Sequence, residues 1–242
     1  HTIKALIVYP GMSMYATPET YIAFDEGQKA YSQAISDIFS HYTRNEDFVS
    51  EFRHVRAEPL PATEHMIESA RAADLVIMSQ EDKNTDRVDQ RHAQEQVIRE
   101  SGRPVIVVPL GYDGPEIGQN ILLGWSETRE ATRAAHDMLN IADDHAAVTV
   151  LGIHNAAKDV LRDAIALDLT AFYSRHGLTA TLEHRAALGE GIPEVLNTVA
   201  FEKGADLIVT GAFGHSKTYD FVIGATTFGL LETLKIPVLF SK

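Results

Sequence analysis

The 242-residue sequence contains no cysteine, which excludes disulfide bonds, thiolate nucleophiles and cysteine-ligated metal sites. Basic residues are also scarce, because 21 Lys and Arg stand against 34 Asp and Glu and give a formal net charge of -13. Binding to nucleic acid or to an anionic membrane surface depends on basic patches. We therefore expect neither partner, and we interpret the acidic excess as a source of solubility.

Long apolar runs are missing as well. No stretch approaches the roughly 20 apolar residues that a membrane-spanning helix needs, and no signal-peptide pattern is visible. A cytoplasmic location is therefore expected. The hydrophobic content of 45% is ordinary for a globular protein, and the length suits one large α/β domain or two small ones.

An internal repeat favours two domains. Residues 73–78 (ADLVIM) match residues 205–210 (ADLIVT), and residues 103–108 match residues 235–240 at almost the same offset. A stretch rich in glycine and proline, residues 110–120, lies between the two copies and is interpreted as a linker.

Both copies alternate strand-like apolar runs with helical patterns. This alternation predicts an α/β fold made of two tandem doubly wound, Rossmann-like domains, each with a parallel sheet and helices on both faces. The domains are predicted at residues 1–110 and 120–242. In the first, strands are expected at 3–9, 49–57, 75–79 and 105–109, and helices at 21–42, 62–72 and 89–101. In the second, strands are expected at 121–125, 148–154, 179–186, 207–209 and 237–240, and helices at 129–142, 158–176 and 192–203, with a fourth helix before the last strand.

The first copy has no equivalent of residues 121 to about 142 of the second. Its opening strand matches the second strand of the other copy. We therefore expect a strand and a helix, roughly 25 residues by comparison with the other copy, to precede His1.

The C-terminal stretch holds the pattern with most chemical content. An apolar run at residues 207–209 is followed by Gly211, Gly214 and Gly224, and then by Thr226 at the start of a helical pattern. Glycine lets the backbone approach a ligand closely, and the free N–H groups of a helix start attract an anion. The pattern predicts a strand, a phosphate-sized loop, a helix and a last strand. The alternative is that these glycines only make a tight turn between a strand and a helix.

The G-x2-G-x9-G spacing between two buried strands resembles the nucleotide loop of the universal stress protein family, and the PVL run at 237–239 is also typical of it. The resemblance implies an adenine-nucleotide-hydrolase-like fold with strand order 3-2-1-4-5. It also implies a site for ATP or a related adenine nucleotide, with Mg²⁺ present only if a nucleotide is bound. ATP-binding members carry Ser or Thr directly after the last glycine, where this chain has Ala225 followed by Thr226.

By this resemblance, the C-terminal domain supplies all of the predicted site residues. Ser126 stands where ATP-binding members carry Asp, and its hydroxyl can still hydrogen-bond a ribose or a base. His154 ends the second strand and His184 lies within the third, which places both near the presumed base pocket, although contact with a ligand is not the favoured interpretation of either. Trp125 is expected in the core. The predicted contacts to phosphate are Gly211, Gly214, His215, Ser216, Gly224, Ala225 and Thr226.

The first copy lacks this loop, because residues 80–87 contain no glycine and are acidic on balance. It is interpreted as a structural partner domain. The resemblance also implies that the last strands of the two copies, 105–108 and 238–240, pair antiparallel in an internal pseudo-dimer, with a further homo-oligomer left open.

No HExxH motif, nucleophile elbow or Walker loop is present, so no catalytic or metal-binding residue is predicted. The leading hypothesis is a stress-response module that acts by binding a nucleotide and signalling its occupancy. One alternative is a protein-interaction module of the same fold that binds no nucleotide. The other is a weak nucleotide hydrolase.

Overall fold

The computed structural model divides the chain into two compact units, His1–Ser69 and Ala70–Lys242. It describes residues 2–10, 17–57, 61–84, 90–114, 116–154, 163–214 and 224–242.

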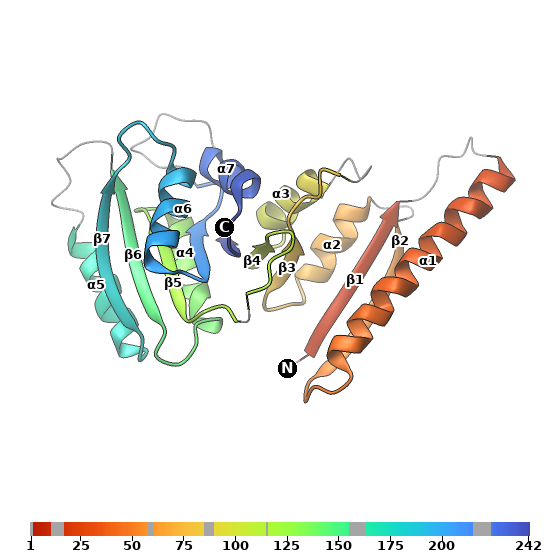
Figure 1. Cartoon of the computed structure of the whole chain (residues 1–242), viewed down its shortest axis with the longest axis horizontal. Coiled ribbons are helices and arrows are strands. Elements are labelled where there is room, and N and C mark those ends of the chain that lie inside the picture. The colour runs from red at the N-terminus through yellow and green to blue at the C-terminus, as the bar shows by residue number, and fades with distance from the viewer. Residues whose placement is uncertain are drawn as a thin grey trace. The chain divides into compact units, whose positions relative to one another are not determined.

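The first unit is built on two parallel strands, β1 (Thr2–Pro10) and β2 (Val49–Ala57), which α1 (Pro18–Thr43) connects (Figure 1). The helix α2 (Ala62–Ala70) follows and ends at the boundary between the units. Helix α1 begins where it does because the Thr17 hydroxyl accepts a hydrogen bond from the Thr20 N–H group at 3.3 Å.

The described part of the first unit contains no fully buried apolar side chain. A single pair of strands under one long helix has too little area to enclose a core. Large apolar side chains therefore remain exposed in this unit: Ile3, Tyr21, Ile22, Tyr31, Ile38, Tyr42 and Val49.

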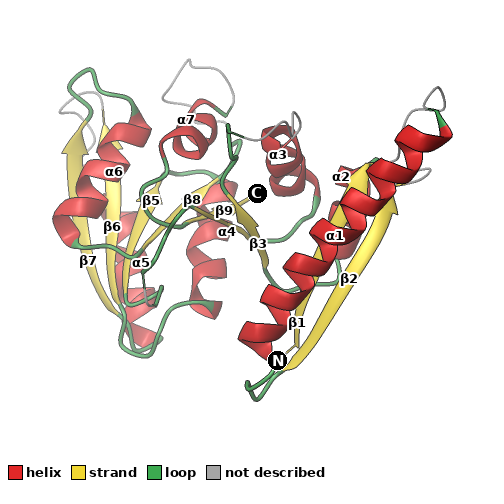
Figure 2. Ribbon diagram, turned by 45° about the vertical axis from the view of Figure 1, so that its right-hand side comes forward, coloured by secondary structure: helices red, strands yellow, loops and turns green. Residues whose placement is uncertain are grey.

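The second unit is organised around a seven-stranded sheet of order β3-β4-β9-β8-β5-β6-β7 (Figure 2). All neighbouring strands are parallel except β4 and β9, which run antiparallel with Val105 opposite Phe240. This mostly parallel sheet confirms the predicted α/β fold, and the order β7-β6-β5-β8-β9 is the expected 3-2-1-4-5. The strands are β3 (Val76–Ser79), β4 (Val105–Val108), β5 (Asn120–Trp125), β6 (Ala147–His154), β7 (Thr179–Ala186), β8 (Leu207–Gly211) and β9 (Val238–Ser241).

The helices of this unit lie close to their predicted places. They are α3 (Gln90–Glu100), α4 (Arg129–Asp137), α5 (Asp163–Arg175), α6 (Ile192–Lys203) and α7 (Ala225–Thr233). The predicted helix 129–142 is α-helical only as far as Asp137, and a short 3-10 helix, η1 (Met138–Asn140), continues it. Gly204 ends α6 in the left-handed conformation (φ 61°), as expected of a glycine after a helix.

The core of the second unit lies on both faces of the central strands. Ile121 and Leu123 of β5 belong to one apolar cluster with residues of α4 and α5, such as Ala134 and Tyr173. Side chains alternate along a strand, so the fully buried Leu122 faces the opposite side, where α6 packs (Figure 1). Burial on both faces explains why the strands read as unbroken apolar runs.

The predicted repeat is spread over both sheets. Strand β5 lies between β6 and β8, whereas β1 and β3, which match β6 and β8 in the repeat, belong to different sheets. In the second copy, β5 joins β6 and β8 into one sheet. The described first copy has no strand equivalent to β5, and its strands form two separate pairs, β1 with β2 and β3 with β4.

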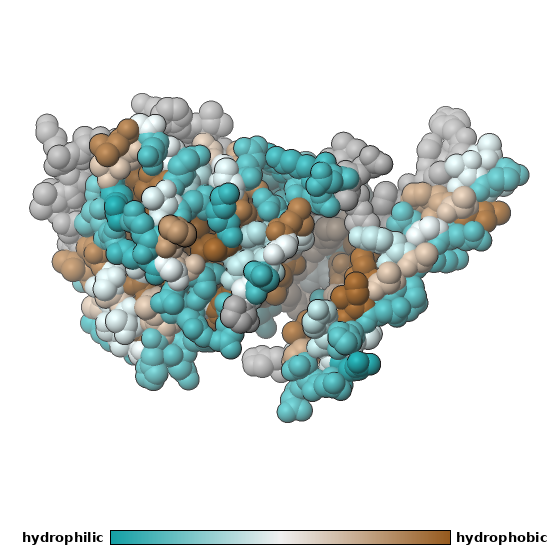
Figure 3. Space-filling model, in the orientation of Figure 1, coloured by the Kyte–Doolittle hydropathy of each residue, from teal (hydrophilic) through white to brown (hydrophobic). Residues whose placement is uncertain are grey.

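Hydrophilic side chains dominate the visible face of the seven-stranded unit, in keeping with the charge of the chain (Figure 3). Among the residues that the structure describes, no helix is long and apolar enough to cross a membrane.

Candidate functional site

A cavity of about 790 Å³ opens at the carboxyl ends of β5, β6 and β8. The chain runs from β5 to β6 and β7 on one side, and then returns to β8 and β9 on the other. The loops at such a switch point diverge and leave a crevice, which is the usual ligand site of an open α/β sheet. The volume falls within the range of roughly 300–1,000 Å³ that small-molecule sites occupy.

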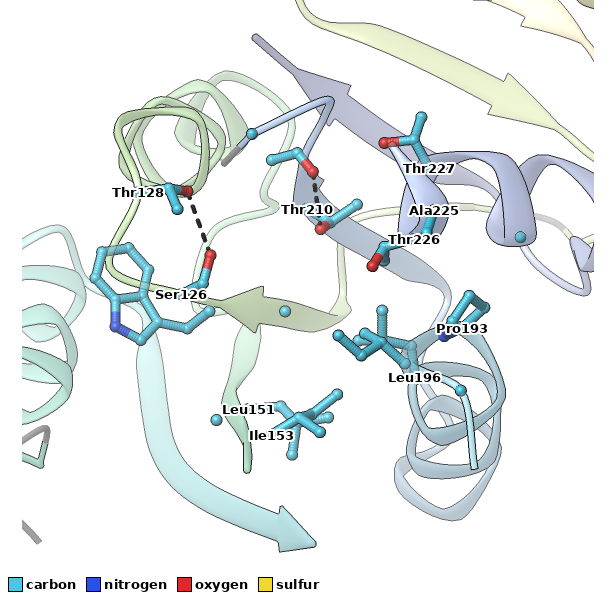
Figure 4. A pocket seen from close by; sticks show the side chains of 18 of the residues that line it. Ser126, Thr128, Leu151, Ile153, Pro193, Leu196, Thr210, Ala225, Thr226 and Thr227 are labelled. Atoms are coloured by element: carbon cyan, nitrogen blue, oxygen red, sulfur yellow. Dashed lines mark hydrogen bonds between the residues drawn. The ribbon is translucent and has the colours of Figure 1, made fainter. Parts of the chain in front are cut away.

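The cavity has an apolar side and a hydroxyl-bearing side (Figure 4). The apolar side chains come from β6 and α6, and the hydroxyl groups come from the ends of β5 and β8 and from the start of α7. A flat apolar group can rest on the first side while its polar edge reaches the second. The apolar set is Leu151, Ile153, Pro193 and Leu196, and the hydroxyl set is Ser126, Thr128, Thr210, Thr226 and Thr227.

The structure brings most of the predicted site residues together around this cavity. His215 and Ser216 lie outside the described residues. Ser126 directly follows β5, and its hydroxyl lies 3.3 Å from that of Thr128. The predicted residues that line the cavity are Ser126, Gly211, Gly214, Gly224, Ala225 and Thr226.

The start of α7 borders the cavity and, among the residues that the structure describes, receives no side-chain cap. Its N-cap residue, Gly224, has a left-handed backbone (φ 93°) and provides no side-chain hydrogen bond. Ala225 and Thr226, in the first turn, both line the cavity. The free N–H groups and the dipole of a helix start favour a negative charge, so this end of the cavity suits a phosphate.

Gly224 is also required by packing. A β-carbon at this position would lie 2.8 Å from Cδ1 of Phe213 and 3.0 Å from Cε2 of Phe228. Thr227 also links α7 to Phe213, because its hydroxyl accepts a hydrogen bond from the Phe213 N–H group at 3.1 Å.

The motif indicates that Gly211 lets a ligand approach the backbone, but the structure shows that packing against α4 requires a glycine here. A β-carbon there would lie 2.5 Å from the amide nitrogen of Ala131 and 2.6 Å from the carbonyl carbon of Glu130. The end of β8 therefore packs directly against the backbone of the first turn of α4. At this position the structure favours the packing interpretation of the glycine.

Glu130 is a member of the site region that sequence reasoning missed. This residue is only 5% exposed, and its Oε1 accepts a hydrogen bond from Nε of Arg129 at 2.8 Å. That bond raises the pKa of Arg129. Its other oxygen lies beside Gly214, where a β-carbon would come within 2.9 Å of Oε2. A glutamate in the first turn of a helix is so common that the sequence gives no sign of this contact.

Two histidines lie at the carboxyl ends of β6 and β7. His154 and His184 both line the cavity, and their rings stack with centroids 4.8 Å apart and an interplanar angle of 25°. Trp125, expected in the core, is only partly buried: it packs against the apolar cluster and also lines the cavity.

Carboxylates supply the formal charge of the described cavity lining. Glu127, Glu190 and Glu194 line it, and all three side chains are exposed. The residues described around the cavity include no lysine or arginine. The described residues also contain no cluster of three or more His, Asp or Glu side chains that could hold a metal ion.

Helix α3, from the predicted first copy, contacts Phe213, which lies between Gly211 and Gly214 in the sequence. The guanidinium carbon of Arg99 lies 3.4 Å from the ring centroid of Phe213, a cation–π contact, and Phe213 has a positive φ of 53°. Phe213 in turn meets Phe228 of α7 edge to face at 5.6 Å. The sequence offered no signal for this link, because the residues on its two sides are more than a hundred positions apart.

Comparison with known proteins agrees with this geometry. The model of the universal stress protein family matches residues 118–242, which is half of the chain and includes every residue that lines the cavity. The chain belongs to the universal stress protein family. No curated protein matches it.

Solved universal stress proteins share the fold at low sequence identity. One from Archaeoglobus fulgidus DSM 4304 is 14% identical over 100% of this chain and 85% of its own, with a TM-score of 0.73. A protein from Pseudomonas aeruginosa UCBPP-PA14 that bears the same family name is 16% identical over 99% of this chain and 92% of its own, with a TM-score of 0.53. At these identities the likeness extends to the fold, and the ligand of this universal stress protein has to be argued from its own residues.

Proposed function

We propose that this universal stress protein is a binding and signalling module that takes an adenine nucleotide in the cavity. The observation that carries the proposal is the start of α7, which no side chain of the described residues caps and which borders a cavity of about 790 Å³ at the switch point of the sheet. The phosphate would lie at the N–H groups of that first turn, and the base would rest on the apolar side formed by residues such as Leu151 and Leu196. Ser126 and Thr128 would bind the ribose.

Signalling by occupancy needs no chemical step. A nucleotide in the cavity would touch elements on both sides of the switch point, namely β5, β6, α6 and α7. Binding would therefore stabilise their mutual arrangement, by about 2.7 kcal/mol at a ligand concentration of 100 times the dissociation constant. The loops around the cavity would then present a partner with a different surface in the bound state.

The second candidate is a protein-interaction module of the same fold without a nucleotide. Two observations favour it: packing accounts for Gly211, and Ala225 provides no hydroxyl group at the start of α7.

A substitution at Ala225 separates the two candidates. Ala225 is exposed and is the first residue of α7, so Ala225→Glu places a carboxylate where the phosphate is proposed to lie without disturbing the core. A carboxylate in the first helical turn favours the helix itself. Ala225→Gln is the matched control, since it has the same size and no charge.

The assay is thermal unfolding with adenosine, AMP, ADP and ATP. For the wild-type chain, a saturating adenine nucleotide is expected to raise the melting temperature by about 5–10 °C. Ala225→Glu should lose most of this shift at equal ligand concentration, while Ala225→Gln should keep most of it. If none of the four ligands shifts the wild-type chain, the nucleotide proposal fails and the interaction module is supported.

A further inference from the structure

Phe213 lines the cavity in a backbone conformation that its own side chain disfavours. It lies between Gly211 and Gly214 with a φ of 53°, and its side chain is buried. A residue with a β-carbon keeps a left-handed backbone only where its surroundings hold it there, because this conformation costs free energy. The contacts that hold Phe213 therefore maintain the shape of this part of the cavity.

Three polar or aromatic contacts with described residues hold Phe213, and two of them come from α7. The Thr227 hydroxyl accepts a hydrogen bond from the Phe213 N–H group at 3.1 Å, and the ring of Phe228 meets that of Phe213 edge to face at 5.6 Å. The third contact comes from α3, where the guanidinium carbon of Arg99 lies 3.4 Å from the centroid of the Phe213 ring. A cation over an aromatic face is attracted by it, more strongly where water is partly excluded.

The ring of Phe213 also lies against the start of α7. A β-carbon at Gly224 would come within 2.8 Å of Cδ1 of Phe213. While the ring occupies this place, a glycine is required at the N-cap of α7, and this N-cap provides no side-chain hydrogen bond. The position of the ring thus helps to set where the N–H groups at the start of α7 lie.

Helix α3 is attached to α7 at a second point as well (Figure 1). Arg91 of α3 forms an ion pair with Glu232 of α7, and its guanidinium carbon lies 5.6 Å from the centroid of the Phe228 ring. These contacts hold α3 against α7 independently of Arg99. Removal of the Arg99 guanidinium alone should therefore loosen Phe213 without separating the two helices.

We propose that Arg99 is a positioning residue of the candidate site, and that α3 of the predicted first copy sets the affinity of the second copy for its ligand through the Phe213 ring. This inference rests on the proposed nucleotide function and specifies how that site is regulated. Arg99 is not among the described residues that line the cavity, so it acts on a ligand through Phe213 and the start of α7. Coupling between two sites is reciprocal, so a nucleotide in the cavity also strengthens the contact between α3 and Phe213. The first copy then responds to the occupancy of the second.

The test is calorimetric titration of the full chain with AMP, ADP and ATP. Arg99→Met keeps an unbranched apolar side chain and removes the guanidinium, and it should weaken the binding of the tightest of the three ligands at least fivefold. Arg103→Met is the matched control. It removes one positive charge from the same copy, but the Arg103 guanidinium donates a hydrogen bond to the Arg71 carbonyl at 3.2 Å and does not contact Phe213. It should change the affinity by less than twofold.

A double-mutant cycle shows whether Arg99 acts through the ring. Phe213→Leu removes the ring and keeps an apolar side chain, so the further substitution Arg99→Met should weaken binding by less than another twofold. A fivefold loss in this background would overturn the inference, since Arg99 would then act on the ligand by its charge. A wild-type affinity in the single variant Arg99→Met would overturn it as well. A thermal melt of each variant without ligand shows whether it folds.

Hydrogen exchange tests the positioning without any ligand. The Phe213 amide, which donates to Thr227, should exchange at least fivefold faster in Arg99→Met than in the wild type, and at the wild-type rate in Arg103→Met. An unchanged rate in Arg99→Met would overturn the inference, even if Phe213→Leu does not fold. If AMP, ADP and ATP all fail to bind the wild-type chain, the proposed function itself fails, and the exchange rate still decides whether Arg99 positions Phe213.

Discussion

The substitution Gly211→Ala tests whether this motif glycine is needed by the fold or by a ligand. In the structure, the end of β8 at Gly211 touches the backbone of Glu130 and Ala131 in the first turn of α4. A methyl group at this position meets main-chain atoms, which cannot turn aside as a side chain can. We therefore expect the substitution to weaken the fold even when no ligand is present.

The size of the effect follows from the distances. The new β-carbon would lie 2.5 Å from the Ala131 nitrogen, whereas non-bonded contacts are optimal near about 3.5 Å, so the helix start must retreat by about 1 Å. Overpacking of this kind costs about 1–3 kcal/mol, and the replacement of glycine in a strand by alanine returns about 0.5–1 kcal/mol. The expected net loss is about 1–2 kcal/mol. With an m-value of about 2 kcal/mol/M, this corresponds to a shift of about 0.5–1 M in the urea midpoint.

The chain provides its own probe and its own control. Trp125 is the single tryptophan and lies in β5, so its fluorescence reports unfolding of the unit that contains Gly211. Gly152→Ala, in the strand β6, is the matched control because its β-carbon would meet side-chain rings and no backbone atom: it would lie 3.0 Å from Nδ1 of His184 and 3.6 Å from Cε1 of His154. A ring can shift by a few tenths of an ångström, so the midpoint of this control should stay within about 0.3 M of the wild type.

A wild-type urea midpoint in Gly211→Ala would refute the packing argument. If such a variant also lost nucleotide binding, the close approach of a ligand would be the reason for the glycine.

Two further predictions concern buried polar contacts, and both are read by urea unfolding with Trp125 fluorescence. The hydroxyl of the fully buried Tyr173 donates a hydrogen bond to the Ala135 carbonyl at 2.9 Å, and burial raises the pKa of Tyr173. A raised pKa stabilises the folded chain below the unfolded value of about 10, and this contribution is lost by up to about 1.4 kcal/mol per unit as the pH rises above it. Tyr173→Phe should therefore be about 1 kcal/mol less stable than wild type at pH 9 and no less stable at pH 11; the same deficit at both pH values would contradict the argument. The Asp206 carboxylate accepts hydrogen bonds from three successive backbone N–H groups, at 2.7 Å from Gly118, 2.9 Å from Gln119 and 2.8 Å from Asn120. Asp206→Asn keeps one acceptor oxygen and turns an NH₂ group toward the remaining donors, so it should cost about 3 kcal/mol, and an unchanged midpoint would show that these bonds do not anchor the start of β5.

The order of helices and strands was predictable because local signals determine it. Apolar runs of strand length, bounded by glycine, proline and polar residues, predicted strands such as β2 and β7, whose ends match the prediction. Gly204 predicted the end of α6 because only a residue without a β-carbon adopts the left-handed conformation easily. The helix predicted at 129–142 is α-helical only to Asp137, because the chain changes to 3-10 geometry at Met138. The apolar pattern of the sequence does not distinguish these two kinds of helix.

The candidate site was predictable in part, for a similar reason. Glycine spacing and a helix start are local features, and the rule that parallel strands present their carboxyl ends at one edge brings Ser126 and Gly211 together. The apolar side of the cavity was missed because Leu151 and Leu196 look like ordinary core residues in a sequence. Their exposure to a cavity depends on how far the loops diverge, which is set by packing between elements distant in the chain.

The sequence by itself determined the elements, the α/β class and the glycine pattern that marks the family, since each of these depends on neighbours along the chain. Only the tertiary structure decided that the Glu130 carboxylate is buried beside Gly214 and that Arg99 lies over Phe213. It also decided that Gly211 packs against the backbone of α4, where a β-carbon would not fit. These facts are contacts between segments tens of residues or more apart. A periodic pattern shows which face of an element is buried, but the identity of the atom that meets it is fixed only when the elements pack.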